Sequence, residues 1–222
     1  PKHDRFERAL EPDCPSVQGF VHQNFAVTPM FTFRSDPGEC PDTMLRDAHH
    51  EVRRAITKAR KECVVETTQD LDRFIRLHKS AYGKSSLVDY DTLERLFGAA
   101  SARGQAEILV ARLDGSRDTA AMVLLKDQWS VYTWLLARDG GRRHGGASSL
   151  LSFEAMRVAS SMGRVLDLDG YVTPAVGSFL TKFGLRPVVR PYVNGSNRLW
   201  QTLRCATTIF RPERIDRHYR VG

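Results

Sequence analysis

The order of apolar patterns between residues 63 and 205 constrains the fold of this chain more than any other sequence feature. Short runs of alternating apolar and polar residues predict strands, and longer runs with apolar residues at steps of three and four predict helices. They follow one another as strand, helix, helix, three strands, helix, strand, helix and two strands. This order predicts an α/β fold around a mixed sheet.

Turn residues set the approximate bounds of these elements. Asp114-Gly115-Ser116 and a tight turn near Asp127 join three strands into a predicted antiparallel meander, and a turn at 194–197 joins the last two strands. The predicted strands are 63–66, 106–113, 119–126, 129–137, 165–168, 187–193 and 199–205, and the predicted helices are 71–82, 90–103, 150–162 and 176–183.

The rest of the chain forms three further segments. The first is rich in proline and is predicted to be an irregular extension with a short extended piece from Phe25 to Phe33. The second is predicted to be one basic amphipathic helix, because apolar residues from Leu45 to Cys63 recur at steps of three and four and the opposite face carries arginine and lysine. The last is a polar tail. The predicted division is 1–42, 43–62, 63–205 and 206–222.

The charge of the chain bears on its partners. The net charge is +7, from 33 Lys and Arg against 26 Asp and Glu. This excess favours an anionic partner such as a phosphorylated cofactor, an acidic carrier protein or RNA, without choosing among them, and a solvated basic surface is the alternative. The sequence has no apolar run long enough for a membrane span, no evident signal peptide and no zinc spacing among its four cysteines. A reduced cytoplasmic protein without a metal is expected, and the start at Pro1 leaves open a missing upstream part.

The segment 139–147 lies between a predicted strand and a predicted helix and contains four glycines and two arginines. The N-terminus of a helix carries unpaired N–H groups and partial positive charge, and glycines let a ligand approach the backbone, so this junction is suited to bind phosphate. It has neither the GK[ST] of a Walker loop nor the spacing of GxGxxG. The alternative is a plain loop before a helix.

Several short motifs together give the chain a family resemblance. Arg142-Arg143-His144-Gly145-Gly146-Ala147 resembles the Q/R-x-x-G-x-G/A motif of the GNAT N-acyltransferases. Leu166–Gly170, Phe179–Gly184 and Arg53–Ala59 are similar to stretches of the FemAB-like and BioF2-like acetyltransferase branch of that superfamily. The resemblance covers about residues 43–205, and it implies a GNAT-like, mostly antiparallel central sheet flanked by helices.

The resemblance also implies how the donor is held. In GNAT enzymes an amine attacks the thioester of acyl-coenzyme A directly, and the absence of a G-x-S-x-G nucleophile motif agrees with this. The strand before the glycine loop offers its backbone to the pantetheine arm, and the loop and the next helix hold the pyrophosphate. With acetyl-coenzyme A as the default donor, the implied cofactor-binding residues are Leu136, Ala137, Arg142, Arg143, Gly145, Gly146 and Ala147.

Two carboxylates are the predicted proton acceptors. Asp167 and Asp169 are two residues apart at the end of a predicted strand, so both point to one face, and neighbouring carboxylates raise the pKa of one member. The alternative is that they cap a turn or pair with an arginine such as Arg164. Leu180 stands where many GNAT enzymes carry a tyrosine acid and FemAB-like enzymes a lysine, so neither group is carried over.

Three aromatic residues, Tyr132, Trp134 and Tyr171, are predicted to line the acceptor pocket. For Tyr132 and Trp134 the alternative is ordinary core packing. His144 is expected either to contact a phosphate or to face water.

The leading interpretation is an N-acyltransferase that moves an acyl group from acyl-coenzyme A to a small-molecule or peptide primary amine. The alternatives are a FemAB-like transferase that uses aminoacyl-tRNA, a transferase that uses an acyl carrier protein, and a degenerate GNAT domain that binds without turnover. The basic helix favours the first alternative, whereas Leu180 and a single GNAT-like unit count against it. The sequence leaves a homodimer open.

Overall fold

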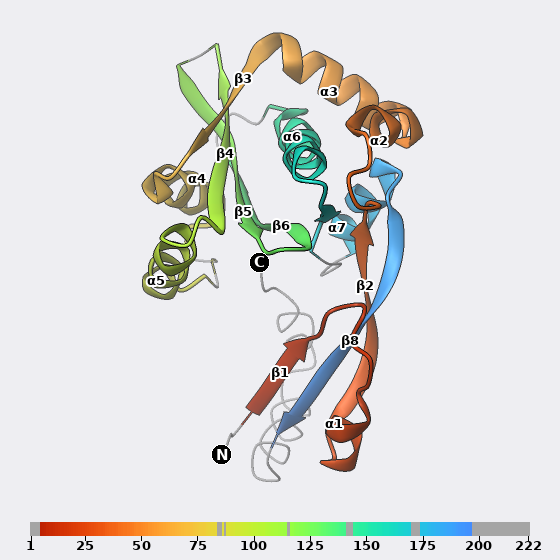
Figure 1. Cartoon of the computed structure of the whole chain (residues 1–222). Helices are drawn as coiled ribbons and strands as arrows, with labels where there is room; N and C mark the ends of the chain where they lie inside the picture. Colours follow the sequence, from red (N-terminus) through yellow and green to blue (C-terminus); the bar gives the residue numbers. More distant parts are fainter. Residues whose placement is uncertain are drawn as a thin grey trace, which may run out of the picture.

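One eight-stranded sheet organises this computed structural model, which describes residues 5–83, 86, 88–114, 116–140, 144–169 and 174–196 (Figure 1). The strands are β1 (Arg5–Ala9), β2 (Ala26–Arg34), β3 (Cys63–Thr68), β4 (Ala106–Leu113), β5 (Arg117–Lys126), β6 (Ser130–Arg138), β7 (Val165–Asp167) and β8 (Arg186–Ser196). Their order is β1-β8-β2-β7-β6-β5-β4-β3, and only β6 and β7 run parallel. The predicted mixed, mostly antiparallel sheet is confirmed.

Helices cover both faces of the sheet (Figure 1). They are α1 (Gln18–His22), α2 (Pro41–Asp47), α3 (His50–Glu62), α4 (Leu71–Tyr82), α5 (Tyr90–Ser101), α6 (Ala147–Ser161), α7 (Pro174–Leu180) and the 3-10 turn η2 (Thr181–Phe183). One apolar cluster joins α4 and α5 to the sheet, and a second joins α2, α3, α6 and η2 to the opposite face. None of the described helices combines the length and the apolar character needed to cross a membrane.

Local sequence signals explain the bounds of several helices. The side chains of Asp70 and Asp89 accept hydrogen bonds from the first-turn amides of α4 and α5, which satisfies N–H groups that a helix start leaves unpaired. Gly163 and Gly184 follow α6 and η2 with φ of +65° and +75°, a left-handed conformation that glycine adopts without steric cost. These elements lie close to their predicted positions.

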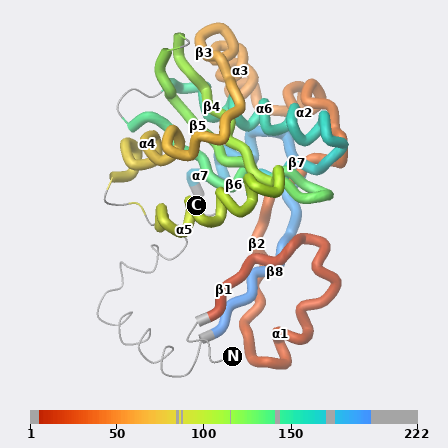
Figure 2. Tube along the Cα trace, turned by 60° about the vertical axis from the view of Figure 1, so that its left-hand side comes forward, coloured from red at the N-terminus to blue at the C-terminus, as the bar shows by residue number. Residues whose placement is uncertain are grey.

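The N-terminal segment differs from the expected irregular extension. Both β1 and β2 pair with β8, and the three strands form a wing that extends away from the other strands and carries α1 at its far end (Figures 1 and 2). Residues 194–196, expected to form a turn, continue β8, because β1 pairs along them. Gly195 is required there, since a side chain would collide with the ring of Phe25. The second late strand, predicted over 199–205, lies outside the described residues.

The basic helix predicted over 43–62 is broken into α2 and α3. Ala48 has extended backbone angles, and one guanidinium nitrogen of Arg53 donates to the carbonyls of Arg46 and Ala48. The N–H of His49 donates to the carbonyl of Lys182 in η2, 2.8 Å away. The break therefore lets the backbone between the two helices bond to a segment that is more than a hundred residues distant in sequence.

Candidate functional site

The pairing of β6 with β7 ends part of the way along β6, and the end of this pairing is here called the β6–β7 divergence. Their parallel pairing covers Ser130–Val165, Val131–Leu166 and Tyr132–Asp167, where β7 ends, whereas β6 continues to Arg138. From residue 133 onward the β7 side of β6 therefore has no described strand partner. The backbone N–H and C=O groups along this edge that no described strand pairs are suited to bond to an extended ligand.

The predicted pantetheine-binding residues lie on this diverging part of β6. Ala137 is fully buried in the apolar cluster under α4 and α5, and Leu136 packs partly buried against the opposite cluster. Their side chains are therefore core residues, and only their backbone groups could serve a ligand.

The glycine loop leads from β6 to α6, and two of its glycines allow close backbone packing. A side chain on Gly140 would collide with the backbone of Ser80 in α4, and one on Gly146 would collide with the carbonyl of Ala55 in α3. Gly145, by contrast, faces open space and is exposed. Arg142 and Arg143, predicted to hold a pyrophosphate, lie outside the described residues.

His144 organises the first turn of α6. Its Nε2 lies 2.7 Å from Oε2 of Glu62, and its Nδ1 accepts from the N–H of Gly146 at 3.2 Å. Its carbonyl accepts from the N–H of Ala147 at 3.4 Å. The His144 side chain is only 7% exposed and bonds inside the protein, so of the two expectations for this residue the one that it faces water is wrong. Among the described residues, no group accepts from the amides of Ser148 and Ser149.

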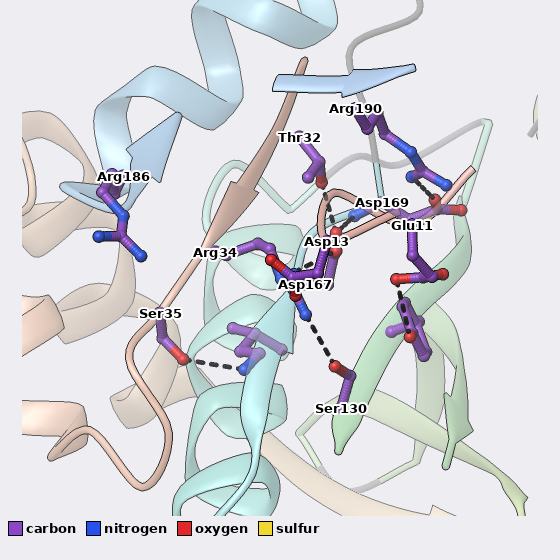
Figure 3. A network of polar contacts seen from close by, with 12 residues as sticks. Glu11, Asp13, Thr32, Arg34, Ser35, Ser130, Asp167, Asp169, Arg186 and Arg190 are labelled. Atoms are coloured by element: carbon purple, nitrogen blue, oxygen red, sulfur yellow. Dashed lines mark hydrogen bonds and ion pairs between the residues drawn. The ribbon is translucent and has the colours of Figure 1, made fainter. Parts of the chain in front are cut away.

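Asp167, one of the two predicted proton acceptors, is fully buried. Its Oδ1 accepts from the hydroxyl of Thr32 in β2 and, at 2.8 Å, from the N–H of Asp169. Its Oδ2 lies 3.4 Å from Nε of Arg34, also in β2 (Figure 3). The arginine beside it is therefore Arg34 rather than Arg164, and the carboxylate fastens β7 to β2.

Asp169 differs from Asp167 because it is partly accessible. Its side chain is 31% exposed and bonds to Nη1 of Arg190 in β8 at 3.0 Å (Figure 3). Burial raises the pKa of Asp169, the Arg190 guanidinium opposes this rise, and the carboxylates of Asp167 and Glu11 add to it. A carboxylate with a raised pKa is suited to accept a proton near neutral pH.

The predicted acceptor-pocket aromatics lie in different surroundings. The hydroxyl of Tyr132 lies 3.0 Å from Oδ2 of Asp127 and 3.4 Å from Oε2 of Glu11, and burial raises the pKa of the phenol. Trp134 packs partly buried against the apolar cluster of α4 and α5. Tyr132 therefore belongs to the polar network beside Asp169, Trp134 belongs to the core, and Tyr171 lies outside the described residues.

Sequence reasoning missed the residues that complete this network. They come from the wing and from the loop after β1, which the sequence placed outside the predicted domain or left without a role. Arg34 also lies 3.4 Å from Asp13 and donates to the hydroxyl of Ser130 at 3.0 Å. No local signal could have found them, because Arg34 and its partner Asp167 lie more than a hundred residues apart in the sequence. The missed residues are Glu11, Asp13, Thr32, Arg34 and Arg190 (Figure 3).

Two other polar clusters of the described residues are weaker candidates for a functional site. A surface cavity of about 500 Å³ is lined by charged groups of β3, β5 and α4, but Arg73 already bonds there to both Glu66 and Asp118. At the start of α3, His49, His50 and Glu51 are close enough to share a cation, yet all are exposed and the ammonium of Lys182 lies 2.7 Å from Glu51.

The parallel strands β6 and β7, joined by the glycine loop and the long helix α6, agree with the GNAT-like arrangement that the sequence motifs predicted. The chain belongs to the acetyltransferase (GNAT) domain family, whose model matches residues 46–171. The matched region begins in α2 and includes all of α3. Membership of this family supports the interpretation that the chain is a transferase. The predicted resemblance is confirmed.

Solved structures share this fold at low sequence identity. FemX has a TM-score of 0.70 at 12% identity, over 90% of this chain and 74% of its own. The C-terminal domain of a putative lysylphosphatidylglycerol synthetase from Agrobacterium fabrum has a TM-score of 0.58 at 14% identity, over 87% of this chain and 69% of its own. A tandem GNAT protein from the clavulanic acid biosynthesis pathway has a TM-score of 0.52 at 12% identity, over 86% of this chain and 63% of its own. No curated protein matches the chain by sequence.

Proposed function

We propose that this chain transfers an acyl group from acyl-coenzyme A, with acetyl-coenzyme A as the default donor, to a primary amine by direct attack. The observation that carries the proposal is the divergence of β6 from β7 directly before α6, in a chain of the GNAT family. This arrangement offers backbone groups to the extended pantetheine arm of the donor and, beyond them, a helix N-terminus to its diphosphate.

The donor would lie along the open edge of β6. Backbone groups of Leu136 and Ala137 would bond to the pantetheine arm. The amides of Gly146 and Ala147 are already engaged by His144, so the amides of Ser148 and Ser149, for which no described residue supplies an acceptor, are better placed to meet the diphosphate. Arg142, Arg143 and the exposed Gly145 remain proposed contributors on sequence grounds.

Asp169 is the proposed general base. The amine arrives as an ammonium, and Asp169, held by Arg190, would accept its proton. Asp167 would act indirectly, by fixing the Asp169 backbone through its N–H bond. Carboxylates of Glu11 and Asp127, with the Tyr132 hydroxyl between them, would favour a cationic acceptor.

The chemical step needs few further groups. The neutral amine nitrogen forms a bond to the thioester carbon, the carbon–sulfur bond breaks, and the coenzyme leaves as a thiolate. The nitrogen loses its second proton as the amide forms, and the thiolate takes up one proton to give the free thiol. Leu180, where the family tyrosine would be, is buried and supplies no acid. A thiol has a pKa of about 8.5, so it is a good leaving group without one.

A second candidate rests on the exposed face of α3. Arg54, Lys58 and Lys61 recur at steps of four and three and have no carboxylate partner among the described residues, unlike Arg73 or Arg190. Such a stripe suits a donor attached to an anionic carrier, either aminoacyl-tRNA or an acyl carrier protein. The fold shared with FemX and with a lysylphosphatidylglycerol synthetase keeps this candidate open.

The two candidates differ in what stabilises the folded chain. Coenzyme A at millimolar concentration should raise the melting temperature, because a ligand that binds only the folded state stabilises it. Acetyl-coenzyme A and a panel of primary amines should then release free thiol. If coenzyme A leaves the melting temperature unchanged while charged tRNA binds with steep salt dependence, the donor assignment is wrong and the second candidate replaces it. Coenzyme A binding without turnover of any amine would instead indicate a binding module.

A further inference from the structure

We infer that His144 is a positioning residue of the donor site: it fastens the first turn of α6 to α3 and so determines which backbone amides remain free for the donor. The identity of the donor rests on the proposed function, whereas the fastening itself does not.

The hydrogen bonds of His144 define a single neutral form of its ring. Nδ1 accepts from the N–H of Gly146, so it carries no proton, and the ring proton lies on Nε2. Nε2–H then points at the carboxylate of Glu62, the last residue of α3, 2.7 Å away. One imidazole therefore links the end of α3 to the start of α6.

Close packing holds the same turn independently. Gly146 lies against the carbonyl of Ala55 so tightly that no side chain fits between them, and Gly146 is also the N-cap residue of α6. The turn is thus fixed on one side by backbone contact and on the other by the histidine. The orientation of the helix start depends on α3 as much as on the loop.

This arrangement divides the amides of the α6 N-terminus into two pairs. Gly146 and Ala147 donate to the ring and to the carbonyl of His144, and both residues are buried. Ser148 and Ser149 have no described acceptor, and Ser148 is partly exposed. Loss of the ring would free the amide of Gly146 and leave the turn held only by its contact with Ala55, so that the directions of the four amides would be less well fixed.

Two conservative substitutions separate the two bonds of the ring. His144→Asn places an acceptor oxygen near the position of Nδ1 and retains the Gly146 bond, whereas His144→Gln reaches further toward Glu62 and loses it. We expect the Asn variant to bind coenzyme A within about twofold of the unsubstituted chain, and the Gln variant to bind about tenfold more weakly, as the loss of a helix cap would cause. His22→Gln, on the exposed helix α1, is the matched control and should leave binding unchanged.

Amide hydrogen exchange at Gly146 gives a readout that does not depend on the donor. The Gly146 amide should stay protected from exchange in His144→Asn and should exchange faster in His144→Gln, when the two variants are compared at equal overall stability. Equal protection at Gly146 in both variants, or equal coenzyme A affinity in both, would overturn the inference. If the unsubstituted chain binds no coenzyme A, the proposed function fails, and the exchange measurement alone decides whether His144 fastens the helix.

Discussion

The donor end of the molecule and the polar network on the other side of the β6–β7 divergence are assembled in different ways. At the donor end, strand, glycine loop and helix follow one another within about 30 residues, and the His144–Gly146 bond joins near neighbours. The polar network instead joins Thr32 to Asp167 across 135 residues and Asp169 to Arg190 across a strand crossover. The donor end is therefore a local motif with one long-range contact, to α3. The polar network forms only when the wing has paired with the rest of the sheet.

This difference predicts where substitutions act. Changes at Asp167, Arg34 or Arg190 should affect stability as well as catalysis, because these charged side chains of the network are mostly buried. Changes in the loop should mainly affect donor binding. Substitution of a glycine that permits close packing should also affect stability.

The largest expected effect is on stability. Arg34→Ala would leave the buried carboxylate of Asp167 without its guanidinium, and loss of one partner of a buried pair costs about 3–5 kcal/mol. The free energy of unfolding from urea titration measures this. Arg186, which pairs in register with Arg34 on β8, is 72% exposed, so Arg186→Ala should change stability by less than about 0.5 kcal/mol. Equal effects of the two substitutions would contradict a buried network.

The next effect is on turnover. Asp169→Asn should lower kcat by about a hundredfold or more, as expected when a general base is removed, and should leave the KM for the donor nearly unchanged. Steady-state kinetics with saturating donor measure both. Asp36→Asn, at a carboxylate that is 75% exposed and lies outside the network, serves as the control. An unchanged kcat in Asp169→Asn would remove this residue from the site.

Substitutions at the two neighbouring glycines test the donor end. Gly146→Ala forces a methyl group against the Ala55 carbonyl and should destabilise the chain by about 1–3 kcal/mol. Gly145→Ala meets nothing within 4 Å and should leave the free energy of unfolding nearly unchanged. If both variants are equally stable, the close packing of the loop on α3 is not a constraint.

The smallest effect is on the pH profile. Because Asp169 must be ionised to act as a base, kcat/KM should fall as the pH is lowered through its raised pKa. The Glu11 carboxylate raises that pKa, so Glu11→Gln should move the acidic limb to lower pH, whereas Arg190→Gln should move it to higher pH. Shifts in the same direction would show that another group controls the limb.

The sequence predicted the local parts of this molecule well. The capped helices α4 and α5 and the meander β4 to β6 lie close to their predicted positions, because apolar period and turn residues are local signals. The wing could not be predicted, since the pairing of β1 and β2 with β8 depends on segments at opposite ends of the chain. The break between α2 and α3 was missed for the same reason, because its backbone bonds to η2.

The same distinction applies to the candidate site. Asp167 and Asp169 stood out because they follow a short apolar strand, but their separate surroundings depend on Arg34 and Arg190 from the wing. The engagement of Gly146 by His144 could not be predicted from the loop composition, which indicated either a phosphate site or a plain loop before a helix.

Hydrogen exchange of the backbone with and without coenzyme A tests most directly whether the opening beside β6 receives a thioester donor. The account predicts that the coenzyme slows exchange along β6 beyond residue 132 and at the amides of Ser148 and Ser149, while β1 and β2 exchange as before. Protection confined to the exposed face of α3, or no protection at saturating coenzyme A, would contradict it.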